Sequence, residues 1–96
     1  DDDFNPEICI LKVDPIYSKK YIYSIINKYN IGNINNISIY PYHKNYNKVV
    51  ISFHHWFDIS LKTLINNNNN FKIIHDIYQG WFWKCIKNNN NHILHS

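Results

Sequence analysis

Lysine and aromatic side chains alternate with aliphatic ones along several short stretches of this 96-residue chain. Ammonium groups pair with phosphates and aromatic rings stack on nucleobases, so these two residue types on one surface are typical of contacts to a single-stranded nucleic acid. All of the basic residues are lysines. Without arginine, the chain lacks the bidentate contacts that read base edges. The candidate contact residues are Lys12, Tyr40, Lys44, Lys48, Phe82 and Lys84.

The histidines do not have the spacing of a metal site. His54 and His55 are adjacent, and adjacent side chains of an extended segment point to opposite sides, so these two rings, even with His75, do not readily share an ion. His92 and His95 are three residues apart, but they lie in a tail that follows an asparagine run. We therefore expect no bound metal.

No residue has the setting of a catalytic nucleophile. Cys9 and Cys85 are far apart in the sequence, which argues against a disulfide framework or a zinc knuckle and fits a reducing compartment. The two glycines, Gly32 and Gly80, cannot form a glycine-rich phosphate loop. Three aspartates occupy turn and helix-cap positions, where local hydrogen bonds account for them. They are Asp14, Asp58 and Asp76. We expect no enzymatic activity and no cofactor.

The elements that must position these side chains follow from apolar periodicity. Alternation with period two predicts strands, and apolar residues three and four apart predict two helices, capped by Ser18 and Asp58. The first helix is expected to stop at Gly32. The predicted strands are Ile8–Val13, Ile37–Tyr40, residues 48–53 and Trp81–Ile86, the last preceded by a short extra piece, Phe71–Ile77, across residues 78–80.

This order of elements predicts an α+β fold of the ferredoxin-like type. Its βαββαβ sandwich has a four-stranded antiparallel sheet with two helices on one face, and the other face of the sheet is open. We assign residues 7–87 to this domain, residues 1–6 to an acidic lead and residues 88–96 to a polar tail rich in asparagine and histidine. A hydrophobic content of 45% suits one small core.

Strand parity decides which side chains face the helices. Ile8 and Ile10 are expected to point inward, as are Trp81 and Trp83, because the opposite choice would bury Lys84 without a partner. The open face then carries apolar residues that offer an alternative use of the same surface, as a protein interface. These possible interface residues are Cys9, Leu11, Val50 and Ile86.

Two strand motifs resemble those of the RNA recognition motif. Ile8–Val13 aligns with the hexamer motif of that family and residues 46–53 align with its octamer motif. With Asn30-Ile31-Gly32 and Trp81-Phe82-Trp83, the chain is most similar to short proteins of this type from nucleocytoplasmic large DNA viruses. The resemblance implies a viral protein that acts in the cytoplasm, in viral factories.

The positions at which the family stacks bases on aromatic rings hold Cys9, Lys48 and Val50 here. Since each lost stack is worth about 1–3 kcal/mol, we expect weak binding of RNA or single-stranded DNA with little sequence preference. The alternative is a protein-interaction or homodimerisation module on a fold that has lost its stacking aromatics. A net charge of +3 tolerates a polyanion without demanding one. No apolar run approaches the roughly 20 residues of a membrane helix, so no membrane partner is expected.

Overall fold

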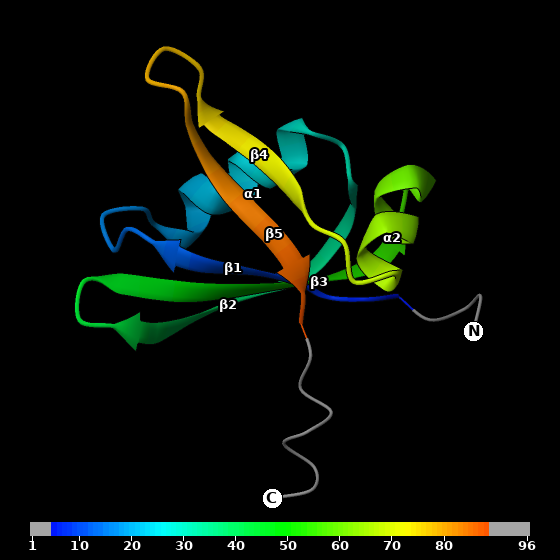
Figure 1. Cartoon of the computed structure of the whole chain (residues 1–96), viewed down its shortest axis with the longest axis horizontal. Coiled ribbons are helices and arrows are strands. Elements are labelled where there is room, and N and C mark those ends of the chain that lie inside the picture. The colour runs from blue at the N-terminus through cyan, green and yellow to red at the C-terminus, as the bar shows by residue number, and fades with distance from the viewer. Residues whose placement is uncertain (1–4, 89–96) are drawn as a thin grey trace, which may run out of the picture.

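The computed structural model describes residues 5–88, which form two helices and five strands (Figure 1). The acidic lead up to residue 4 and the tail from residue 89, with His92 and His95, lie outside the described residues. In chain order the elements are β1 (Ile8–Val13), α1 (Lys19–Lys28), β2 (Gly32–His43), β3 (Tyr46–Trp56), α2 (Ile59–Asn66), β4 (Phe71–Asp76) and β5 (Trp81–Lys87).

All five strands belong to one antiparallel sheet with the order β2-β3-β1-β5-β4. The prediction of a four-stranded ferredoxin-like sheet is therefore wrong. The segment expected to be a short extra piece is a full strand, because β4 pairs with β5 from Phe71↔Cys85 to Asp76↔Trp81. It extends the sheet by one strand at the β5 edge, and its partner β5 takes the place beside β1.

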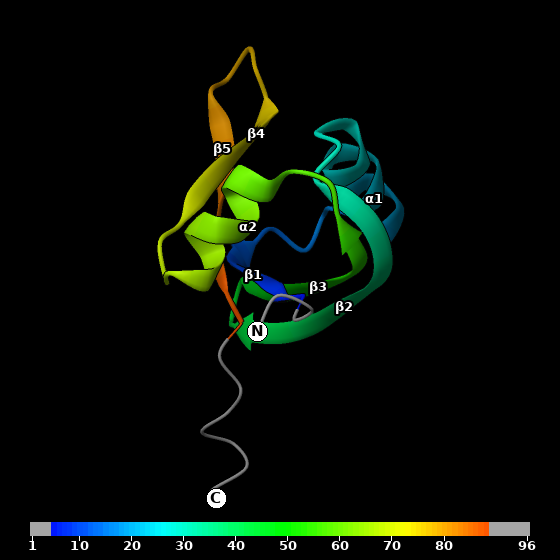
Figure 2. The same cartoon turned by 90° about the vertical axis from the view of Figure 1, so that its right-hand side faces the viewer.

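One hydrophobic core lies between the sheet and the helices. Alternate residues of the strands point into it, such as Ile8 and Ile10 of β1, and α1 and α2 contribute to the same cluster. Figure 2 shows the sheet curving around both helices. In the described part of the chain, no helix is long and apolar enough to cross a membrane. The helical members of the core are Ile22, Ile26 and Ile65.

The helix caps agree with the sequence at the start of each helix and differ at the end of α1. The Ser18 hydroxyl accepts a hydrogen bond from the Tyr21 backbone N–H, and the Asp58 carboxylate caps α2 in the same way. Helix α1 ends at Lys28 rather than at Gly32, because Asn30 takes the left-handed conformation (φ 55°) that ends a helix. Gly32 begins β2 instead, where a Cβ would overlap the carbonyl of the facing strand.

The central strand β1 changes course before it ends. Its register with β3 shifts between Ile10 and Val13, and Lys12 within this bulge has a φ of 60°. After the bulge β1 stays with β3, since Val13 is paired with Asn47. The pairing between β1 and β5 ends at Ile10↔Cys85. The first residues of β5 are consequently separated from β1.

The free edge of β4 is protected by two tyrosine hydroxyls, one from α1 and one from the residue that caps its C-terminal end. The Tyr29 hydroxyl donates to the carbonyl of Ile74 at 2.8 Å and accepts from the Ile74 N–H at 3.0 Å. The Tyr21 hydroxyl donates to the carbonyl of His75 at 3.3 Å. These bonds occupy backbone groups that an edge strand otherwise offers to another chain.

Replacement of Tyr29 by phenylalanine tests this edge protection. We expect the free energy of unfolding to fall by about 1 kcal/mol, because two hydrogen bonds are lost at a site where water replaces them only in part. Urea denaturation of Tyr29→Phe measures the change. Tyr23→Phe is the control, since Tyr23 lies on the same helix and is exposed. Equal stability losses in the two variants would contradict a role for the hydroxyl on β4.

Candidate nucleic-acid interface

A row of lysines crosses the sheet face that is not covered by the helices. Lys48 on β3 pairs with Tyr40 on β2, and Lys84 on β5 pairs with Lys72 on β4. Lys48 and Lys84 each precede a strand partner of Ile10, namely Val49 and Cys85, and β1 runs antiparallel to both strands, so both lysines lie toward the Leu11 end of β1. The row therefore has one part on β2 and β3 and another on β5 and β4, with β1 between them.

Two exposed aromatic rings in or beside this row contact lysine ammonium groups. The Lys48 Nζ lies 5.6 Å from the centre of the Tyr40 ring, and the Lys72 Nζ lies 4.5 Å from the centre of the Phe82 ring. Tyr40 is 48% exposed and Phe82 is 47% exposed. The rings are thus held by cation–π contacts while part of their surface stays free for another partner.

The four carboxylates of residues 5–88 do not occupy the strand positions of the lysine row, and the one nearest to Leu11 in sequence is Asp14, in the segment that follows β1. Glu7 precedes Leu11 by four residues, about 14 Å along an extended strand, and accepts a hydrogen bond from the Asn88 side chain. Asp58 caps α2, and Asp76 accepts hydrogen bonds from the backbone of the β4–β5 turn. The row keeps an unbalanced positive charge on its side of the sheet.

The remaining predicted residues are spread over this face and its rim. Lys44 lies in the β2–β3 turn and is exposed, and Lys12 is exposed at the bulge of β1. Cys9 alternates with the core residues Ile8 and Ile10, as expected, but only 4% of its surface is exposed. It therefore adds little to an apolar interface. Leu11 is partly exposed, and Val50 and Ile86 are half-buried.

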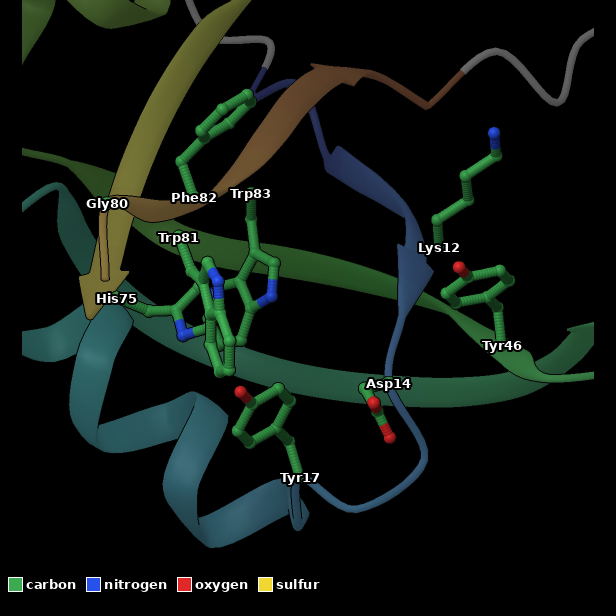
Figure 3. Close-up of a pocket in the computed structure, with 9 residues that line it drawn as sticks. All are labelled: Lys12, Asp14, Tyr17, Tyr46, His75, Gly80, Trp81, Phe82 and Trp83. Carbon is green, nitrogen blue, oxygen red and sulfur yellow. The ribbon is translucent and has the colours of Figure 1, made fainter.

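A pocket of about 440 Å³ opens where β5 separates from β1. In Figure 3 the wall from β5 and the end of β4 carries the indoles and an imidazole, and the facing wall carries Lys12, Asp14 and Tyr46. Tyr17 lies below both walls, and Lys12 and Phe82 extend toward the opposite side of the strands from Trp83. We call this pocket the aromatic slot. Its lining is Lys12, Asp14, Tyr17, Tyr46, His75, Gly80, Trp81, Phe82 and Trp83.

The two tryptophans of β5 have different environments. Trp83 is buried, stacks on His75 with ring centres 4.3 Å apart and meets the edge of Tyr17 at 5.9 Å. Trp81 shares the parity of Trp83, but it is 49% exposed, so the prediction that it belongs to the core is wrong. The physical reason is its position at the start of β5, where β1 no longer lies alongside.

His75 is a neutral member of this aromatic cluster. Desolvation by the surrounding rings lowers the pKa of its imidazole, and the nearby Asp76 carboxylate opposes the shift in part. Its Nδ1 atom is buried and has no hydrogen-bond partner. The ring is also contacted by Tyr17 at a centroid distance of 5.1 Å.

The cysteines show no sign of a reactive thiolate. Burial raises the pKa of both thiols above the ordinary value, for Cys9 against a smaller opposing effect of Lys48. Both cysteines are reduced and buried. Within residues 5–88, histidines, cysteines and carboxylates do not gather into a group that could hold a metal ion.

Sequence reasoning missed Lys72 and the slot residues Tyr17 and His75. The alternation of β4 could have placed Lys72 outward, because Phe71 and Ile73 point to the core. The slot depends on a bulge and on the separation of two strands, which periodicity does not reveal. Comparison with protein-family models, curated proteins and solved structures gave no match to this chain.

The stacked imidazole predicts a pH dependence of stability. Because the folded state lowers the pKa of His75, stability is greatest above the ordinary histidine pKa of 6.5 and falls as the pH drops below it. We expect the midpoint temperature of thermal unfolding to decrease when the pH is lowered from 7.5 to 5.5, and to decrease less in His75→Phe. His54→Gln is the control, since His54 is exposed. The same pH dependence in His75→Phe would show that other groups cause it.

Proposed function

We propose that this protein binds RNA or single-stranded DNA through the open sheet face, weakly and with little sequence preference. The observation that carries the proposal is the lysine row, in which Lys48, Lys84 and Lys72 cross the sheet without a carboxylate beside them. Lysines at this spacing can contact successive phosphates of one strand.

The two rings beside the row supply base stacking in place of the usual family aromatics. A base stacked on Tyr40 or Phe82 contributes about 1–3 kcal/mol, and stacking accepts any base. Lysine recognises phosphate as a point charge and does not read base edges in a fixed geometry. Both features support general affinity rather than recognition of a sequence.

The opposed lysines of β4 and β5 favour binding of an anion to this face. Like charges directly across a strand pair destabilise a sheet, and Lys72 and Lys84 face each other. A phosphate between them replaces repulsion by two attractive contacts. Binding is therefore expected to stabilise the folded state against unfolding.

A homodimer through the same face fits the charge pattern less well. An isologous dimer places each surface patch against its own copy, so the lysine rows of two subunits would meet. The apolar members of the face, such as Leu11 and Ile74, are exposed but lie beside lysines of the neighbouring strands. If the protein does not bind nucleic acid, we infer instead that this face binds another protein.

Other expectations from the sequence stay predictions. They are the relation to the RNA recognition motif, the viral origin, the cytoplasmic location and the lack of enzymatic activity. None of them is needed for the binding proposal, which depends only on the charges and rings of the open face.

Fluorescence anisotropy with a mixed-sequence single-stranded RNA, at two salt concentrations, tests the proposal. We expect Lys84→Gln and Lys72→Gln each to weaken binding and to lower the salt slope by about 0.7, the value for one phosphate of a single strand. Phe82→Leu is expected to weaken binding about tenfold without changing the slope, because it removes one stack.

The matched control is Lys20→Gln, which removes an exposed lysine from α1 on the helix side. It is expected to leave the affinity close to that of the parent chain. Equal losses in Lys20→Gln and Lys84→Gln would mean that net charge, and not the sheet face, attracts the RNA. If the folded parent does not bind, the proposal is wrong, and its oligomeric state becomes the next measurement.

A further inference from the structure

The aromatic slot continues the lysine row around the end of the sheet. Lys12 follows Leu11 of the row directly, and Phe82 lies beside Lys72 on the open face and also lines the slot. A strand of nucleic acid that leaves the row at β5 therefore meets the slot next. The volume of about 440 Å³ falls in the range of sites that hold small molecules, about 300–1,000 Å³.

The slot surfaces suit a flat aromatic ligand. Trp81 and Tyr46 come from opposite walls, and each is exposed over a large part of its ring. Trp83, His75 and Tyr17 already pack against one another, so they form a rigid support rather than a free surface. An exposed indole on such a support is a stacking platform.

Two charged groups define what the rest of the ligand must be. Lys12 lines the slot, and its side chain extends toward the open face, where its ammonium group can contact a phosphate. Asp14 uses one carboxylate oxygen, Oδ1, to accept from the Ile16 N–H at 3.0 Å. A carboxylate only accepts hydrogen bonds, so its other oxygen suits a ligand edge that donates. Among the bases, guanine carries two neighbouring donors, N1–H and N2–H₂, on its Watson–Crick edge, and one carboxylate can accept from both because Oδ1 keeps a second lone pair.

We propose that the aromatic slot binds one guanine nucleotide, stacked on Trp81, with its donor edge at Asp14 and its phosphate at Lys12. The proposal rests on the proposed function only for the source of that guanine, which is the strand crossing the lysine row. It assigns base selection to the slot, whereas the row supplies affinity for any sequence.

Titration of the folded chain with GMP, AMP, CMP and UMP, followed by NMR at the indole N–H signals, tests the slot. We expect GMP to shift the Trp81 signal and to bind about tenfold more tightly than AMP, as one paired contact to a base edge allows. Equal affinity for all four nucleotides, or no shift of Trp81 with GMP, would overturn the proposal.

Three variants separate the parts of the site. Asp14→Asn keeps an oxygen for the Ile16 N–H but turns the second oxygen into a donor, so it is expected to lose the preference for GMP while AMP binding persists. Lys12→Asn suits the left-handed backbone and is expected to weaken all four nucleotides alike. Trp81→Leu is expected to abolish binding and Trp81→Phe to restore it. An unchanged preference in Asp14→Asn would exclude guanine recognition by this carboxylate.

Oligonucleotides distinguish this proposal from the binding proposal. A uridine-only oligonucleotide reports the lysine row, and the same oligonucleotide with one guanine adds the slot. If the uridine-only strand binds and guanine adds nothing, the slot proposal fails alone. If the uridine-only strand does not bind while the guanine-containing strand and GMP both shift Trp81, the slot stands and the function proposed for the sheet face fails.

Discussion

The course of β1 is the constraint on which the rest of the structure depends. This strand lies at the centre of the sheet, with β3 on one side and β5 on the other, and it supplies the buried residues Ile8 and Ile10. At Lys12 the left-handed backbone moves it away from β5 and keeps it on β3. The bulge thus lies between the two parts of the lysine row and opens the aromatic slot between β1 and β5. A left-handed lysine costs about 1 kcal/mol, which the pairing on both sides of β1 must offset.

Charge on the open face works against stability in the free protein. Lys72 and Lys84 are directly opposite, and the cation–π contact between Lys72 and Phe82 relieves the repulsion only in part. Nothing in the core requires two lysines there, because the alternate positions Ile73 and Trp83 are the ones that pack. A pair of this kind is easier to understand on a surface that is neutralised by an anion than on one that faces only water.

Local signals in the sequence predict most elements but not their assembly. The bounds of β1 follow from a short apolar run that ends before Asp14-Pro15, the caps Ser18 and Asp58 follow from cap chemistry, and the structure confirms them. The additional strand, β4, has an apolar sequence, but the predicted four-stranded sheet had no position for it. Its place is settled by the hairpin pairing with β5 and by the hydroxyl of Tyr29, and the second of these is a contact between segments remote in sequence. Parity likewise placed Trp81 on the correct side but could not show that the core ends before it.

The side chains of β5 contribute alternately to the open face and to the aromatic slot. Because neighbouring residues of a strand point to opposite faces, Phe82 joins the lysines of the open face, while Trp81 and Trp83 line the slot on the helix side. The face has lysines and exposed rings, which give affinity without reading a base. A carboxylate or an amide held in a fixed position is one of the groups that can read a base edge in a chain without arginine. Asp14 has such a position, because its turn bond to Ile16 holds it at the foot of the slot. The two proposals therefore assign affinity and selectivity to different residues on the two sides of one strand.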